Sequence, residues 1–184
     1  MTYYFSACSL LALFAGVIGS ASAPAEEAAH SALAHTHEQF SFVVNAAYEQ
    51  VFPLFGAYEE RKWAKGFDPQ FIYPFPARDQ QGMVFTTDQE GLRRVWTNTV
   101  FDPVSGQVQY IYFVNDTMIA LIDIHLTKVD IAETRVNVVY ERTALRPETN
   151  AQVAEFARGD GNSGPKWAEE IAGYLERSSA AALK

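Results

Sequence analysis

Residues 108–129 read VQYIYFVNDTMIALIDIHLTKV, and this stretch decides the fold. Two runs rich in β-branched and aromatic residues flank Asn115-Asp116, a pair typical of a tight turn between antiparallel strands. Alternate residues of a strand share one face. In the second run the face with positions 120, 122, 124 and 126 is uniformly apolar, so we expect it to point inward.

Strand patterns of the same kind lie on both sides of this hairpin. They cover residues 40–45, 70–75, 83–88, 94–101, 108–114, 117–129 and 134–145. Gly, Pro, Asn and Asp gather in the short segments between the later strands, as turns require. Because no helix-length pattern interrupts the last six strands, the sequence predicts one antiparallel sheet of about seven strands.

Two short helices are expected after the first strand. Asn45 can cap a helix over residues 46–55, which Pro53 keeps short because proline lacks an amide donor. A second short helix is expected over residues 57–66, where the glycine at its end stops it.

The C-terminal part returns to a helical period. Residues 147–157 predict one helix, residues 159–165 interrupt it, and a long amphipathic helix follows with Trp167 and Ile171 on its apolar face. The predicted fold class is therefore α+β, in which a curved antiparallel sheet wraps around a long C-terminal helix.

This order of elements resembles the helix-grip plan of the START-like (SRPBCC) superfamily, which includes birch-pollen-allergen-like and polyketide cyclase/dehydrase-like proteins. The sequence is similar to a bacterial branch of uncharacterised members over residues 38–175. The resemblance rests on VFPLFG at 51–56, WAKGFDP at 63–69, IYP at 72–74, GMVFTT at 82–87, Trp96, FDP at 101–103 and YERTAL at 140–145. It implies a deep, mostly apolar cavity between the sheet and the C-terminal helix.

The N-terminal segment predicts export. Residues 9–19 form an apolar run of signal-peptide length, and Ala21-Ser22-Ala23 follows as a cleavage pattern. We therefore expect a signal peptide at 1–23, a flexible leader at 24–37 and a START-like domain at 38–184. The expected location is periplasmic or secreted, with an uncleaved membrane anchor as the alternative.

Composition excludes several classes of partner. The 184 residues include 14 Lys and Arg against 22 Asp and Glu, a net charge of −8 that repels nucleic-acid backbones. One cysteine allows neither an internal disulfide nor a cysteine-based zinc cluster. We expect no nucleic acid, no membrane span after cleavage, and a monomer or weak dimer whose partner is a hydrophobic small molecule or lipid-like ligand.

An apolar pocket with a few placed polar groups is the ordinary make-up of a small-molecule site. On the strength of the resemblance, the residues expected to line the ligand site are Tyr73, Trp96, Tyr110, Tyr112, Tyr140, Arg142 and Trp167. The alternative is that the aromatic residues fill a solid core and that Arg142 forms a salt bridge at a strand end.

Other chemistry-bearing residues have weaker patterns. Glu60 or Arg61 could polarise a ligand near the cavity mouth, although such charge clusters are usually solvated helix faces. Asp123 and His125 share a strand face and could pair for acid–base work. The spacing of His30, His35 and His37 could hold copper or zinc, but no further ligand completes a site, so we expect no metal.

No phosphate-binding, dinucleotide-binding, nucleophile-elbow or zinc-protease motif occurs, so no cofactor is expected. Three hypotheses remain open. The first is an exported protein that sequesters a hydrophobic or aromatic molecule in an internal cavity. The second is a cyclase/dehydratase-type enzyme that uses the same cavity and a Tyr or Glu60 for acid–base chemistry. The third is a structural or interaction protein with a filled core.

Overall fold

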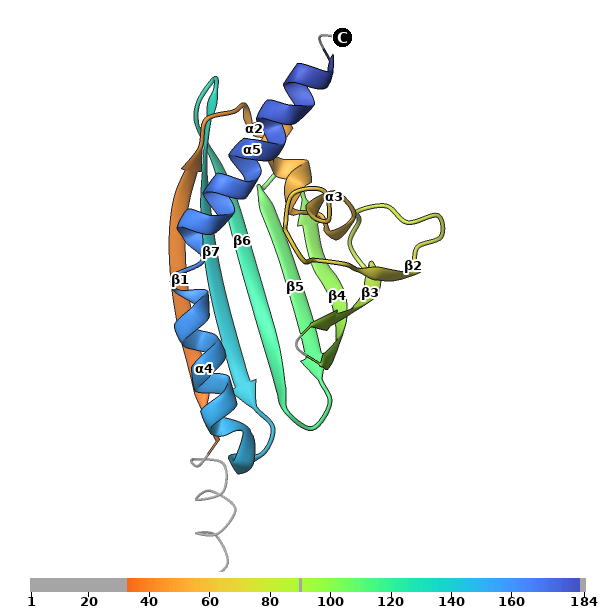
Figure 1. Cartoon of the computed structure of the whole chain (residues 1–184), viewed down its shortest axis with the longest axis vertical. Coiled ribbons are helices and arrows are strands. Elements are labelled where there is room, and N and C mark those ends of the chain that lie inside the picture. Colours follow the sequence, from red (N-terminus) through yellow and green to blue (C-terminus); the bar gives the residue numbers. More distant parts are fainter. Residues whose placement is uncertain (1–32, 90, 183–184) are drawn as a thin grey trace, which may run out of the picture. The chain divides into compact units, whose positions relative to one another are not determined.

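The structure is a computed structural model that describes residues 33–89 and 91–182. The predicted signal peptide at 1–23, and the part of the predicted leader before residue 33, lie outside the described residues. Within the described part, one antiparallel sheet is packed against two C-terminal helices, with short helices after the first strand (Figure 1). This confirms the predicted α+β fold class.

The sheet has seven strands in the order β1-β7-β6-β5-β4-β3-β2, so the first and last strands of the chain are neighbours. Their bounds are β1 His35–Val44, β2 Gln70–Tyr73, β3 Val84–Gln89, β4 Leu92–Asp102, β5 Gln107–Val114, β6 Met118–Asp130 and β7 Glu133–Ala144. The hairpin that joins β5 to β6 turns at Asn115-Asp116 as expected, and it pairs Val114 with Met118.

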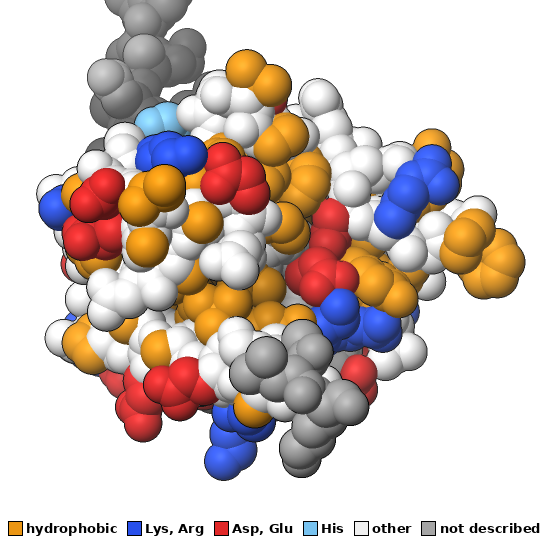
Figure 2. All heavy atoms as spheres, turned by 90° about the horizontal axis from the view of Figure 1, so that it is seen from above, with side chains coloured by type: hydrophobic (Ala, Val, Ile, Leu, Met, Phe, Trp, Pro, Cys, Tyr) orange, Lys and Arg blue, Asp and Glu red, His pale blue; other side chains and the backbone are white. Residues whose placement is uncertain are grey.

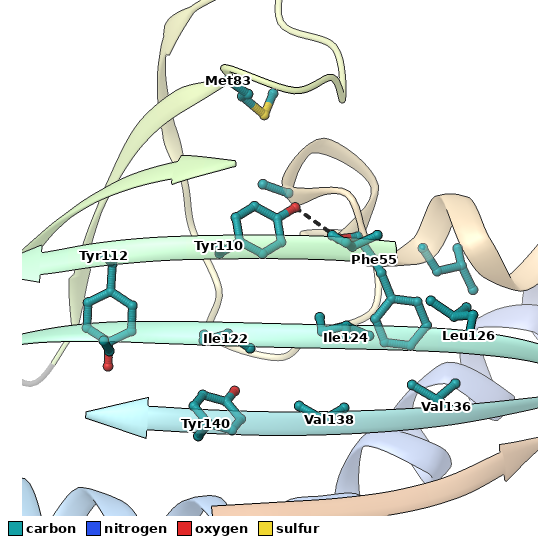
Figure 3. Close-up of a cluster of buried hydrophobic side chains, with 14 of the residues drawn as sticks. Phe55, Met83, Tyr110, Tyr112, Ile122, Ile124, Leu126, Val136, Val138 and Tyr140 are labelled. Carbon is teal, nitrogen blue, oxygen red and sulfur yellow. Dashed lines mark hydrogen bonds between the residues drawn. The ribbon is translucent and has the colours of Figure 1, made fainter. Parts of the chain in front are cut away.

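The inner face of the sheet is the predicted one. Ala120, Ile122, Ile124 and Leu126 of β6 are all buried, while His125 on the opposite face is exposed. The same alternation holds in β5, where Val108, Tyr110, Tyr112 and Val114 are buried. Figure 3 shows the labelled side chains of β5 and β6 beside Val136, Val138 and Tyr140 of β7. The core therefore lies between this face of the sheet and the helices.

The helices after β1 are shorter than expected. They are α2 (Tyr48–Val51), a 3₁₀ turn η1 (Phe52–Phe55) and α3 (Ala57–Glu60). The predicted cap at Asn45 is wrong, because α2 begins after Ala47 and has no side-chain cap. The predicted second helix also ends early, at Glu60, and irregular turns follow it.

Those turns are fixed by side chains rather than by helical hydrogen bonds. The indole Nε1 of buried Trp63 donates to the Leu54 carbonyl oxygen at 2.6 Å, which ties the chain after α3 back to η1. Gly66 then takes a φ of +84°, a left-handed conformation that other residues rarely adopt. The chain can therefore reverse toward β2 without a longer helix.

The C-terminal helices are α4 (Asn150–Asp160), preceded by a 3₁₀ turn η2 (Pro147–Thr149), and α5 (Gly164–Ala182). Both lie along the side of the sheet formed by β1 and β7 (Figure 1). None of the helices within the described ranges is both long and apolar enough to cross a membrane.

β1 begins at His35, five residues before the strand that the sequence predicts and three before the predicted domain boundary at residue 38. Ten consecutive residues of β1 pair with β7, from His35 opposite Thr143 to Val44 opposite Thr134. At the start of β1, every second residue points to the exposed outer face and is polar. A search for apolar runs therefore does not detect this part of the strand.

Candidate functional site

A cavity of about 210 Å³ lies between the inner face of the sheet and the first half of α5. The end of α3 and the turns after it form its third side. Its lining residues are Glu60, Ala64, Lys65, Phe67, Phe85, Gln89, Trp96, Tyr110, Ile122, Ile124, Tyr140, Lys166, Trp167 and Glu170. Five strands, α3 and α5 thus contribute to one site.

Aromatic residues make up six of the fourteen lining residues. Phe85 and Trp96 are stacked with their centroids 5.5 Å apart, and Tyr110 meets the edge of this pair at 6.1 and 6.3 Å. Across the cavity, Trp167 of α5 meets Tyr140 of β7 at 6.5 Å. These contacts keep the rings in fixed orientations around the cavity.

Glu60 is the acidic group within this aromatic wall. Its side chain is partly accessible because it lines the cavity. Among the described residues, no hydrogen bond or ion pair engages its carboxyl group. Burial, and next the nearby charge of Asp79, raises the pKa of Glu60 from 4.5 to about 8. At neutral pH, Glu60 is therefore mostly a neutral acid that can donate a hydrogen bond.

Asp79 belongs to the loop between β2 and β3. Its carboxylate accepts hydrogen bonds from the backbone amides of Tyr58 at 2.7 Å and Glu59 at 3.2 Å. Burial raises the pKa of Asp79, and these two hydrogen bonds oppose that rise. Asp79 thus holds the loop against the start of α3 and places a second carboxyl group near Glu60.

The two cavity phenols are held in different ways. The Tyr110 hydroxyl donates to the Phe55 carbonyl oxygen at 2.9 Å (Figure 3). Burial, followed by the charge of Glu60, raises the pKa of Tyr110 well above its usual value. Burial, followed by the charge of Asp160, does the same for Tyr140. Both phenols therefore stay protonated at any physiological pH.

The structure brings four of the seven predicted ligand residues together. Trp96, Tyr110, Tyr140 and Trp167 line the same cavity. Tyr73 does not, because it lies on the edge strand β2 with 55% of its surface exposed.

Tyr112 and Arg142 are buried but lie outside the cavity lining. Arg142 forms a bidentate ion pair with Asp160 of α4, with Nε–Oδ2 at 2.5 Å and Nη2–Oδ1 at 2.7 Å. It also donates to the Tyr112 hydroxyl. Of the two predictions for Arg142, the salt bridge at a strand end agrees better with the structure than the ligand site does. The bridge is, however, buried, and it joins the sheet to α4.

The remaining candidates are on the outer face of the sheet. Asp123 accepts a hydrogen bond from Gln107 at 3.0 Å, and exposed His125 is not its partner. His35 contacts the Thr143 hydroxyl, and His37 lies 3.5 Å from Glu141. His30 lies outside the described residues. Within the described ranges, no group of three or more His, Cys, Asp or Glu could hold a metal ion.

Sequence reasoning missed Asp79, Phe67 and Phe85 as parts of this site. Phe85 comes two positions after Met83 within the strand that the sequence predicts at 83–88, and this spacing indicates that both apolar side chains share the inward face. Asp79 and Phe67 lie in irregular segments, so no periodic pattern could reveal where they point.

On the face seen in Figure 2, acidic and basic side chains are interspersed among apolar ones. Near the cavity, Glu59 and Lys62 form an ion pair at 2.6 Å, as expected for a solvated helix face. Lys166 lies 4.0 Å from Glu170 at the cavity rim.

No protein-family model matches the sequence, and a comparison with curated proteins finds no match. Solved structures, however, share the fold. Norcoclaurine synthase from Thalictrum flavum, in complex with dopamine and hydroxybenzaldehyde, is similar with a TM-score of 0.58 and 11% identity, over 94% of this chain and 98% of that one.

The ZhuI aromatase/cyclase from a Streptomyces species has a TM-score of 0.58 and 13% identity, over 81% of this chain and 98% of that one. Ara h 8.0201 has a TM-score of 0.52 and 12% identity, over 78% of this chain and 99% of that one. These likenesses confirm the helix-grip fold that the resemblance implied.

Proposed function

We propose that this chain, which has the helix-grip fold of START-like proteins, is exported and sequesters a compact hydrophobic or aromatic molecule in the cavity beneath α5. The observation that carries the proposal is the space of about 210 Å³ walled by the rings of Phe85, Trp96, Tyr110, Tyr140 and Trp167. Mostly aromatic and aliphatic walls with a few convergent polar groups suit a small organic ligand.

The volume favours a compact ligand. A cavity of about 150 Å³ accommodates benzene, whereas pockets for drug-sized molecules span about 300–1,000 Å³. At about 210 Å³, the space suits one substituted aromatic ring rather than a long acyl chain. It also argues against a filled core, because it has room for several water molecules.

The test begins with protein purified from its own export compartment, by native mass spectrometry and then by organic extraction. A co-purifying compact organic molecule supports the proposal. A protein that neither carries nor takes up any small aromatic molecule contradicts it.

A matched pair of variants locates the site. Ala64 lines the cavity, so Ala64→Phe should fill part of it and reduce ligand uptake at least tenfold. Ala181→Phe adds the same ring on the exposed end of α5 and should leave uptake unchanged. Equal uptake by both variants contradicts the assignment of this cavity.

Glu60 favours a second candidate function, a cyclase/dehydratase-type enzyme. A carboxyl group that stays protonated near neutral pH can act as a general acid toward a ligand carbonyl. If such turnover occurs, its rate should fall as the pH rises through about 8, and Glu60→Gln should abolish it. Turnover that persists in Glu60→Gln excludes this role.

A further inference from the structure

Glu60 is a carboxyl group that lacks a positive partner. Among the described residues, every ion pair lies elsewhere, and no hydrogen bond reaches the carboxyl oxygens of Glu60. Removing an ionised carboxylate from water is costly unless a counter-charge or hydrogen bonds replace the water. A bound ligand can supply the missing counter-charge.

The charge nearest to Glu60 has the same sign. The Asp79 carboxylate, held by the amides of Tyr58 and Glu59, acts on Glu60 through space. A second carboxyl group near Glu60, although it does not line the cavity, favours a positive ligand group beside Glu60 over a negative one.

The aromatic wall adds to the same preference. The face of an indole or phenol ring attracts a cation, and tryptophan does so most strongly. Trp96 and Tyr110 stand on the sheet side, and Trp167 stands on the α5 side of the same space. A cation beside Glu60 would therefore meet ring faces in place of the water that it loses.

The basic residues of the lining do not fill this role. Lys65 and Lys166 are both exposed, and Lys166 lies 4.0 Å from Glu170. Solvent screens their charges, and neither forms an ion pair with Glu60. The inner part of the cavity thus has an acidic group without its own cation.

We propose that the cavity takes a compact aromatic amine, whose ammonium group pairs with the Glu60 carboxylate while its ring packs among Trp96, Tyr110 and Trp167. This inference rests on the proposed binding function and adds the charge of the ligand. A neutral hydrogen-bond acceptor would bind only the single O–H donor of protonated Glu60. An ammonium group interacts with both the carboxylate and the ring faces.

The proposal predicts that ligand binding is coupled to the release of a proton from Glu60. The empty cavity holds Glu60 with a pKa of about 8, and an ammonium ligand requires its ionised form, so binding below pH 8 releases a proton. The other charged or titratable groups around Glu60 are Asp79, Tyr110, Tyr140, Lys65, Lys166 and Glu170. Because about 1% of Glu60 is ionised at pH 6 and about half at pH 8, affinity should rise about 50-fold between them.

The experiment compares 2-phenylethylamine with 2-phenylethanol, which has nearly the same shape without the charge. Calorimetric titrations at pH 6, 7 and 8, in buffers of different ionisation enthalpy, give both affinity and proton release. Glu60→Gln removes the carboxylate, and Glu169→Gln removes an exposed charge of α5 that lies outside the cavity lining. Thermal unfolding of each variant checks that it is folded.

The expected result at pH 8 is that the amine binds at least tenfold more tightly than the alcohol and releases about half a proton, a release that approaches one proton at pH 6. Glu60→Gln should lose this preference but still bind the alcohol, and Glu169→Gln should behave as the parent chain. Equal or tighter binding of the alcohol overturns the amine proposal and leaves the binding function standing. If neither probe binds the folded parent chain at millimolar concentration, both proposals are overturned.

Discussion

Replacing Glu60 with Gln should stabilise the folded chain by an amount that grows with pH. Glu60 has a pKa of 4.5 in an ordinary environment and about 8 in the fold, so the folded state holds its proton more tightly. The stability that this proton contributes is fully present below pH 4.5 and is lost as the pH rises through about 8. Glutamine has nearly the same shape and never ionises, so it avoids the loss.

The magnitude follows from the two pKa values. Each tenfold difference in proton affinity corresponds to about 1.4 kcal/mol. The gap in unfolding free energy between Glu60→Gln and the parent should therefore grow by up to about 4 kcal/mol between pH 5 and pH 9, with more than half of the growth complete by pH 7. Water that enters the cavity reduces this figure, so about 2 kcal/mol is the smallest growth consistent with the argument.

Urea unfolding at pH 5, 7 and 9 measures the gap, with fluorescence of Trp63, Trp96 and Trp167 as the signal. Other titrating groups are common to both proteins and cancel in the difference. Glu169→Gln serves as the control, because its exposed carboxylate should give a gap that does not vary with pH. A gap for Glu60→Gln that stays constant from pH 5 to pH 9 would falsify the assignment of a buried, unpaired carboxyl group.

Other substitutions test the rest of the site and its support. Asp160→Asn should cost about 3–5 kcal/mol in urea unfolding, because it leaves the Arg142 guanidinium buried without its counter-charge. Tyr112→Phe should cost about 1 kcal/mol but change the affinity for an aromatic probe less than twofold, since Tyr112 lies outside the cavity lining. Gly56→Ala should cost about 1–3 kcal/mol, because its Cβ would overlap the carboxylate that caps α3, whereas Gly159→Ala has free space and should be neutral or stabilising.

The sheet was predictable because its signals are local and periodic. The inward face of β6 and the turn at Asn115-Asp116 follow from residue types at fixed spacing. The start of β1 at His35 was not, because its pairing with β7 comes from residues about a hundred positions later in the chain. Asn45 has the right chemistry for a cap, but the tertiary structure starts the helix two residues later.

The site was only half predictable for a related reason. Trp96, Tyr110, Tyr140 and Trp167, which line the cavity, could be named only from the resemblance to the helix-grip plan, because strand alternation by itself does not show which face borders a cavity. Tyr112 obeys the same alternation, but Arg142, on the same inner face of β7, donates to its hydroxyl, and Tyr112 lies outside the cavity lining. Whether an inward side chain meets a cavity or another side chain depends on packing that no single strand encodes.

Two acids of the domain, Asp160 and Glu60, make the clearest argument about where function lies. Asp160 is paired with Arg142 through two hydrogen bonds, so its burial joins α4 to the sheet and needs no ligand. Within the part of the chain that the structure describes, Glu60 has no such pair, and its neighbour Asp79 makes its ionisation harder. A filled core would be more stable with an apolar or amide side chain at position 60. An acid that lowers stability at neutral pH, and that faces an aromatic cavity, is best explained by the ligand or reaction that it serves.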